Sequence, residues 1–126
     1  MILSFSRATS TLTVILADNS ETTWPAANNV QSGSLPWPDG VYQFVQRVTH
    51  PGDGPDSPYG SYGGLLFDVP GRTGMEVHSG RASVPDGLGR VGAQHCTLGC
   101  IRTTDDAVAA IVAAMAGDAL AAITVG

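Results

Sequence analysis

The sequence has few charged residues, and no cluster of positive charge among them. Charged residues make up 13% of the 126 positions, and eleven acidic residues outnumber six basic ones, for a net charge of −5. The arginines are scattered along the chain. A surface that tracks nucleic acid needs a concentrated basic stripe. We therefore expect no nucleic-acid partner.

Cysteine is also scarce, since the chain contains only Cys96 and Cys100. Small secreted domains that depend on disulfides normally carry four or more cysteines, so this fold must depend on its hydrophobic core. The pair leaves three interpretations open: a redox pair, zinc ligands together with His78 and His95, or a nucleophile beside a structural thiol. Adjacent His95 and Cys96 rarely reach one tetrahedral ion. We expect no metal and no cofactor.

A long hydrophobic run is missing as well. The apolar opening, residues 1–17, is interrupted by Ser and Thr and lacks a basic start. A membrane span needs about 20 apolar residues, and a secretory signal needs a basic n-region. We expect neither a membrane span nor a signal peptide in the sequence as given.

What the sequence does contain is alternating β-branched stretches and one helical stretch. Sixteen glycines and eight prolines mark turns and loops between them. The helix is expected within 103–118, with Thr103 or Thr104 as N-cap and acids in its first turn. Many strands and one late helix predict a mainly β fold over residues 1–126 as a single domain, either a sandwich or an open barrel. Strands are expected at 2–6, 11–16, up to Trp24, 41–49, 65–69, 75–78 and 119–126.

Cys100 lies where a reactive thiol is expected. A helix start follows it by three or four residues, Arg102 is nearby, and His78 ends an upstream strand. Helix N-termini, cations and histidines all lower the pKa of a thiol. Gly99 suits a tight turn whose backbone N–H groups face a developing oxyanion. The pattern favours a cysteine nucleophile for acyl transfer, although a buried structural cysteine remains the alternative.

Two blocks resemble the L,D-transpeptidase catalytic domain (YkuD type): "VHSG" at 77–80 and "TLGCIR" at 97–102. In that family a strand ends in His followed by Gly or Ser, and a Ser/Thr-x-Gly-Cys block opens onto a helix. The resemblance implies an L,D-transpeptidase-like fold, with the helix after the cysteine turn. It also implies Cys100 as nucleophile, His78 as base, and Ser79 or Gly80 as the neighbour that orients the imidazole.

Further roles follow from the same resemblance and from position. Thr97 and Gly99 would shape the oxyanion site, and Arg102 would support the turn or meet a substrate carboxylate. Substrate contact is also considered for three residues in loops: His95, Trp37 and Tyr59. The competing interpretation is packing in the core or a loop for Trp37 and Tyr59, and solvation or a local hydrogen bond for His95.

The resemblance implies chemistry on peptidoglycan stem peptides. Family members attack the bond between an L-centre and a D-centre, release the D-residue, and pass the acyl group to an amine or to water. The expected activity is therefore L,D-transpeptidase or L,D-carboxypeptidase, acting at the bacterial cell wall or periplasm. Without a signal peptide, the chain would be exported by another route or be an excised domain.

The sequence departs from the family at Leu98, where most members have His. Short interbacterial toxins of this fold tolerate a different residue there, and their loop is similar to 28–42. As a toxin, the protein would have an immunity or delivery protein as partner. The alternative function is a catalytically silent module that binds cell wall or a partner. The sequence does not specify an oligomeric state.

Overall fold

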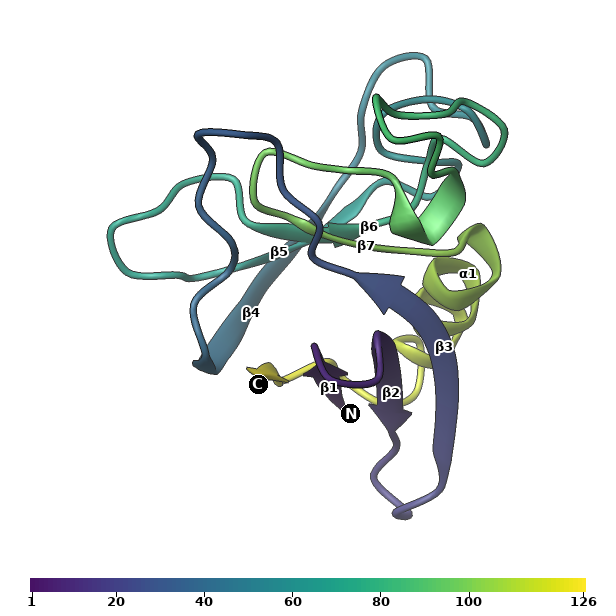
Figure 1. Cartoon of the computed structure of the whole chain (residues 1–126). Helices are drawn as coiled ribbons and strands as arrows, with labels where there is room; N and C mark the ends of the chain where they lie inside the picture. The colour runs from purple at the N-terminus through teal and green to yellow at the C-terminus, as the bar shows by residue number, and fades with distance from the viewer.

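The computed structural model describes residues 1–126, and its eight strands close into a barrel in the order β1-β2-β3-β7-β6-β5-β4-β8. The prediction of a mainly β fold with one helix is confirmed (Figure 1). Of the two arrangements expected, a sandwich or an open barrel, the strands adopt a barrel, and it is closed rather than open. The strands are β1 (Ile2–Ser6), β2 (Thr11–Ile15), β3 (Glu21–Ala27), β4 (Gly40–Val48), β5 (Gly64–Phe67), β6 (Glu76–His78), β7 (Ile101–Thr103) and β8 (Ala122–Val125).

The first hairpin forms because its apolar residues alternate with polar ones. Leu3 and Phe5 of β1 and Leu12 and Val14 of β2 are buried, while their neighbours along each strand are more accessible. This period of two is what a sheet with one buried face requires. β1 also pairs in parallel with β8, which joins the two ends of the chain and closes the barrel.

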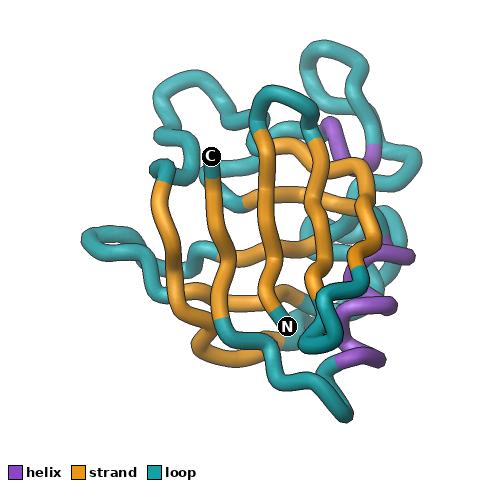
Figure 2. Tube along the Cα trace, turned by 90° about the horizontal axis from the view of Figure 1, so that it is seen from below, coloured by secondary structure: helices purple, strands orange, loops and turns teal.

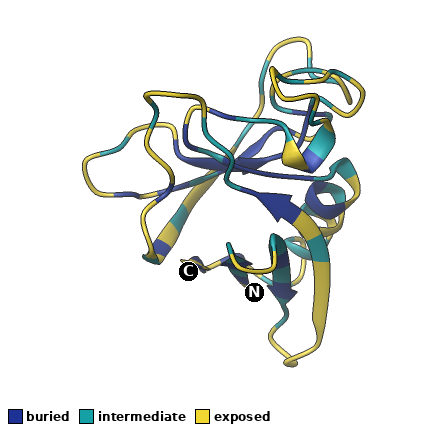
Figure 3. Cartoon of the chain, viewed as in Figure 1, coloured by how far each residue is buried: buried dark blue, intermediate teal, exposed yellow.

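The barrel interior holds one hydrophobic cluster of 18 buried residues. Trp37 lies within it with no accessible surface, and its ring packs edge-on against Tyr42 and Phe67 at centroid distances of 6.0 Å. β6 and β7 are buried along their length, whereas the loops that leave the barrel are largely exposed (Figure 3). The centre of the sheet is therefore rigidly packed at the strands that carry His78 and Arg102.

The helix α1 (Asp105–Ala114) lies at one side of the strands (Figure 2). Thr104 is its N-cap, since its Oγ1 accepts a hydrogen bond from the Ala107 N–H at 3.1 Å. Ala107, Val108 and Ile111 bury its apolar face. No helix in the structure has the length and hydropathy of a membrane span.

Strand β7 was not among the strands expected from the sequence. It contains three residues and leads directly into α1, and it pairs in parallel with β6 so that His78 lies opposite Arg102. A strand of three residues is too short to show the alternation of apolar and polar residues by which strands are predicted. Its effect on the fold is large, because it places the cysteine turn beside the end of β6.

Two long loops lie together at this end of the barrel (Figure 1). The backbone N–H groups of Arg81 and Ala82 donate to the carbonyls of Ser57 and Pro55, each at 3.1 Å. The loop between β4 and β5 and the loop after β6 thus form one layer above β6 and β7. This layer and the cysteine turn enclose the site described next.

Candidate active site

A pocket of about 220 Å³ lies between the two long loops and the cysteine turn. The site residues predicted from the sequence are far apart in the chain, and several of them lie at this pocket. Six of the predicted residues line it: Tyr59, His78, His95, Thr97, Cys100 and Arg102. The same pocket is also lined by Arg81, Cys96 and Leu98.

His78 ends β6 and is almost fully buried, with 3% of its surface exposed. Its Nδ1 donates to the carbonyl oxygen of Ser79 at 2.7 Å, which leaves the lone pair of Nε2 without a partner in the protein. Burial lowers the pKa of His78 to about 4, the bond to Ser79 opposes this, and the charges of Arg102 and His50 lower it further. The imidazole is therefore neutral at neutral pH and able to accept a proton.

Cys100 is a protonated thiol in this environment. Burial is the largest effect and raises the pKa of the thiol, and the negative charge of Glu76 raises it further. The hydrogen bond from the Glu76 N–H and the charges of Arg102 and Arg72 lower the pKa. Sγ accepts from the Glu76 N–H and donates to the Gly74 carbonyl, both at 3.4 Å. The nearby arginines lower the pKa as expected, but burial outweighs them, so the expectation of an ionised thiol is not met.

No hydrogen bond joins Cys100 to His78, although both line the pocket. The thiol proton is directed to Gly74. Catalytic hydrogen bonds are often long or misaligned without substrate and tighten once it binds. Cys100 and His78 therefore share the pocket without a direct hydrogen bond in this structure.

The turn that presents Cys100 is held by side chains on both sides. Thr97 Oγ1 donates to the Cys100 carbonyl at 2.7 Å and accepts from the Gly99 N–H at 3.1 Å. Asn28 Nδ2 donates to the carbonyls of Gly99 and Cys100 at 2.7 and 3.0 Å. Gly99 has φ +149°, a backbone conformation that residues with a Cβ rarely adopt. The turn therefore requires glycine at this position.

The contacts of the cysteine turn show which backbone N–H group is available as an oxyanion donor. The Gly99 N–H is already bonded to Thr97, whereas the Cys100 N–H makes no hydrogen bond within the protein. Of these two N–H groups, that of Cys100 is free to face a developing negative charge. Thr97 and Gly99 shape the turn rather than supply an unused donor.

Ser79 and Gly80 hold His78 in place through backbone geometry. Ser79 has no accessible surface, and its Oγ donates to Asp105 Oδ1 at 2.5 Å. Gly80 has φ +106°, and a Cβ there would clash with the Ser57 carbonyl oxygen. Only glycine allows the two loops to approach this closely. Ser79 therefore orients the imidazole through its carbonyl, while its hydroxyl is fixed to the first residue of α1.

Arg102 is buried, and each of its three guanidinium nitrogens is bonded within the protein. Nε donates to the Ser79 carbonyl at 3.2 Å, Nη2 to the Pro58 carbonyl at 2.9 Å, and Nη1 to the Cys96 carbonyl at 3.0 Å. Nη1 also lies 2.8 Å from His95 Nδ1. These bonds connect β7 to both loops, so Arg102 supports the turn, one of its two expected roles. Contact with a substrate carboxylate stays a prediction.

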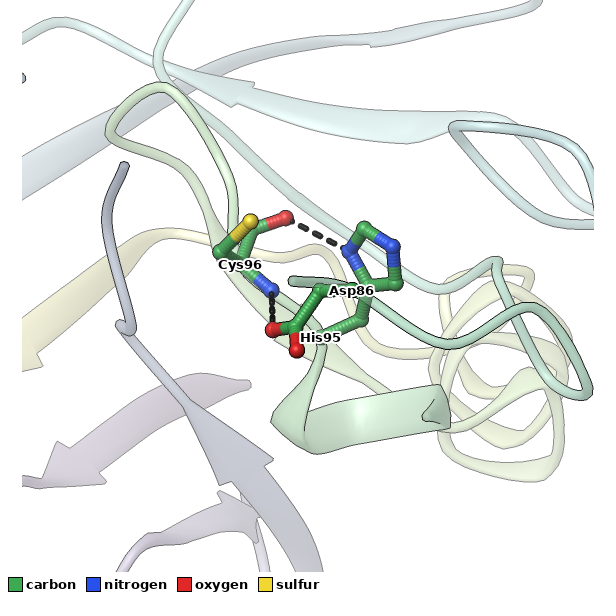
Figure 4. A group of neighbouring side chains, drawn as sticks. All are labelled: Asp86, His95 and Cys96. Carbon is green, nitrogen blue, oxygen red and sulfur yellow. Dashed lines mark hydrogen bonds between the residues drawn. The ribbon is translucent and has the colours of Figure 1, made fainter. Parts of the chain in front are cut away.

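Asp86, His95 and Cys96 form the one cluster with the residue types of a metal site (Figure 4). Their ligand atoms all lie within 4.8 Å of one another. The Asp86 carboxylate, however, already accepts hydrogen bonds from the N–H groups of Leu88, Arg90 and Cys96 and from Arg90 Nε. The Arg102 charge beside His95 also opposes a cation. We therefore assign Asp86 to holding the loop, and both cysteines are free thiols.

Tyr59 lies in a row of rings that ends at His78. Its ring stacks on His50 at 3.6 Å between centroids, and it meets the His78 ring edge-on at 5.0 Å. His50 Nε2 in turn lies 3.1 Å from Glu76 Oε1, and Glu76 is buried. The row fixes the His78 ring from the side of the β4–β5 loop. Tyr59 also faces the pocket, so its predicted contact with substrate remains open.

Trp37 does not take part in the site. Of the two interpretations given for Trp37, substrate contact and packing, the structure shows packing. Its side chain has no accessible surface and fills the barrel core, and a side chain without accessible surface cannot contact a bound peptide. A large aromatic ring gains more from burial beneath a loop than from exposure on it.

Sequence reasoning missed four residues that position the site: Asn28, His50, Glu76 and Asp105. The sequence predicts acids in the first helical turn, and Asp105 is one of them, yet its carboxylate also accepts bonds from Ser79 and Ser61. The alternation in β6 carried a signal for Glu76, because residues two apart in a strand share a face with each other. Nothing local pointed to His50, whose partners are distant in sequence.

The comparisons with known proteins support the fold. No protein-family model and no curated protein matches the chain. Among solved structures, the crystal structure of Mycobacterium tuberculosis L,D-transpeptidase 1 is similar over 99% of this chain, with a TM-score of 0.59 and 18% sequence identity. This chain covers 60% of that chain. A mainly β barrel with one helix, in the L,D-transpeptidase fold, is therefore the architecture of this protein.

Proposed function

We propose that the protein is a cysteine acyl-transferase that acts on peptidoglycan stem peptides. The observation that carries this is the pocket shared by His78, with an unbonded Nε2, and Cys100, with an unbonded backbone N–H. A base, a nucleophile and a donor for the oxyanion are the groups that acyl transfer needs. The fold adds support, because the similar solved structure is that of an L,D-transpeptidase.

The first half of the reaction forms a thioester. The Cys100 thiol gives its proton to His78 Nε2 while its sulfur attacks the carbonyl carbon between the L-centre and the D-centre. The carbonyl oxygen becomes negative and accepts from the Cys100 N–H. The intermediate then collapses, the C–N bond breaks, and His78 returns the proton to the leaving amine.

The second half releases the acyl group. An amine of another stem, or water, attacks the thioester carbon and gives a proton to His78. The C–S bond breaks, and the Cys100 sulfur recovers a proton from His78. Because burial raises the pKa of Cys100 and lowers that of His78, the proton moves as the bond to carbon forms rather than before.

Such an enzyme would act at the bacterial cell wall, where stem peptides are found. The toxin context depends on the sequence of the loop 28–42 and on Leu98, which is 72% exposed at the rim of the pocket. It stays a prediction from sequence.

The test is incubation with a stem tetrapeptide that ends in D-alanine, followed by mass spectrometry of the products. Wild type should release D-alanine, with either a cross-linked dimer or a tripeptide as the other product. Cys100→Ala should form neither product. Cys96→Ala is the matched control, because it removes the neighbouring thiol and should keep activity. Equal product from wild type and Cys100→Ala would refute the proposal.

A catalytically silent binding module is the second candidate. It is favoured by the raised pKa of Cys100 and by the absence of a hydrogen bond between Cys100 and His78. Such a module would bind the tetrapeptide and leave it intact. Binding without any product after prolonged incubation would select this function over catalysis.

A further inference from the structure

Five of the six basic side chains are bonded to acceptors within the protein. Arg7 bonds to Asp39 and Asn28, Arg90 to Asp86, and the others to backbone carbonyls. The guanidinium of Arg81 makes no hydrogen bond and no salt bridge. The protein, with a net charge of −5, therefore leaves one arginine without an internal partner.

Arg81 lines the pocket that holds Cys100 and His78. None of the residues lining this pocket is acidic, while Arg81 and Arg102 are both part of its wall. Asp86, which lies near Arg102, is held by Arg90 and by backbone N–H groups. The pocket is therefore a positively charged concavity in an acidic protein, which attracts and concentrates anions.

The two arginines act on each other without a carboxylate between them in the pocket. Burial, followed by the charge of Arg81, lowers the pKa of Arg102 to about 10. Each guanidinium nitrogen of Arg102 already donates to a carbonyl, and Nη1 also lies against His95, so Arg102 has fewer free donors for a ligand than Arg81 has. A bound anion would relieve this repulsion, and Arg81 is the residue free to bind it.

The backbone at Arg81 is fixed in an unusual conformation. Its φ is +53°, in the left-handed region that only two other non-glycine residues of the chain occupy. Its N–H donates to Ser57 and its carbonyl accepts from the Gly92 N–H at 2.7 Å, so both sides of the residue are held. A long side chain in this conformation costs about 1 kcal/mol relative to glycine. The backbone is therefore held on both sides of Arg81, while the Arg81 guanidinium has no partner.

We propose that Arg81 is a specificity-determining residue that binds a free carboxylate of the peptide substrate beside the reacting carbonyl. The planar fork of the guanidinium matches a carboxylate with two parallel hydrogen bonds. The carboxylate comes either from the C-terminus of the leaving residue or from the side chain of the residue on the acyl side. This inference rests on the proposed function for its substrate.

The experiment measures binding, so that it does not depend on turnover. A Cys100→Ala protein is titrated calorimetrically with three tetrapeptides: one with free carboxylates, one amidated at the C-terminus, and one amidated at the side chain of the acyl residue. Each titration is repeated with Arg81→Asn and Arg81→Lys in the Cys100→Ala background. Asn tolerates the left-handed backbone, so this variant should fold, and its thermal unfolding is recorded.

The free peptide should bind at least tenfold more weakly to the Arg81→Asn protein, because a charge-assisted pair is lost. One of the two amidated peptides should bind the parent equally weakly and be insensitive to Arg81→Asn, which identifies the carboxylate. Arg81→Lys should recover part of the affinity. Arg47→Gln, which removes an exposed charge outside this pocket, is the control and should bind like the parent.

Two results would overturn the inference: unchanged affinity in the Arg81→Asn protein, or failure of the free peptide to bind the parent. Failure of the proposed function is a separate outcome. If wild type forms no product while the peptide binds in an Arg81-dependent way, carboxylate recognition stands and the acyl-transferase proposal falls.

Discussion

The Nδ1 of His78 donates to the carbonyl oxygen of Ser79 at 2.7 Å, and this single bond fixes which nitrogen of the buried ring can act as a base. Ser79 is held in turn by Arg102 through its carbonyl and by Asp105 through its hydroxyl. The His78 imidazole is therefore oriented by Ser79, which is itself held by two hydrogen bonds to other elements.

Asp105 should matter far more than the acid next to it. Asp105→Ala removes the bonds from Ser79 and Ser61 and leaves a buried hydroxyl unpaired, so unfolding free energy should fall by about 1–3 kcal/mol. Asp106 is exposed and is the matched control in the same helical turn. Asp106→Ala should change stability by about 0.5 kcal/mol or less. Urea denaturation of both variants measures this, and equal losses would contradict the role given to Asp105.

Stability should fall when His78 is forced to take up a proton. Its pKa is about 4 in the folded protein and about 6.5 when unfolded. Between these values the unfolded chain binds the extra proton, so stability declines as pH falls from about 6.5 to 4, by about 3 kcal/mol in total. His78→Gln should lack this part of the pH dependence. Denaturation midpoints at several pH values test it, and identical slopes in both proteins would argue against a buried neutral imidazole.

Cys100 should react slowly as a free thiol near neutral pH. Burial raises its pKa, so the thiolate fraction at pH 7 is smaller than for an ordinary cysteine and increases only at higher pH. Iodoacetamide labelling of a Cys96→Ser protein, followed over pH, measures the midpoint at Cys100 alone. The expected midpoint lies above that of a free cysteine. Labelling faster than free cysteine at pH 7 would show an ionised thiol instead.

The stacked rings of His50 and Tyr59 should contribute to catalysis by holding the His78 ring in its orientation. Tyr59→Phe keeps the stacking and should retain most activity, whereas Tyr59→Ala frees the His78 ring and should lower kcat by about tenfold, the cost of roughly 1.4 kcal/mol in orientation. KM and kcat for the tetrapeptide are measured separately. If both variants raised KM with kcat unchanged, Tyr59 would be a substrate contact rather than a positioning residue.

Features that depend on residues close together in the chain could be predicted from the sequence, and features that depend on distant residues could not. The β1–β2 hairpin and the Thr104 cap depend on neighbouring residues, and both agree with the sequence pattern. The pairing of His78 with Arg102 depends on β7, which is too short to show a period. The resemblance indicated that Cys100 and His78 belong together, and the structure puts both at one pocket.

Burial is the property that local sequence describes least well. Trp37 was considered as a substrate contact, yet it fills the core. Cys100 lines the pocket as expected, but burial raises the pKa of its thiol. Both outcomes depend on the loops that cover them, and loop placement comes from long-range contacts such as Arg72 to Leu35 and Arg102 to Pro58. No window of neighbouring residues contains those contacts.

The most direct test of the central claim is the intact mass of the protein after mixing with the stem tetrapeptide. Wild type should gain the mass of the peptide without its terminal D-alanine, and peptide mapping should locate the added mass on Cys100. Cys100→Ala should gain nothing, and His78→Gln should gain it far more slowly. An unmodified wild-type protein that still releases D-alanine, or an adduct on any other residue, would contradict a Cys100 thioester.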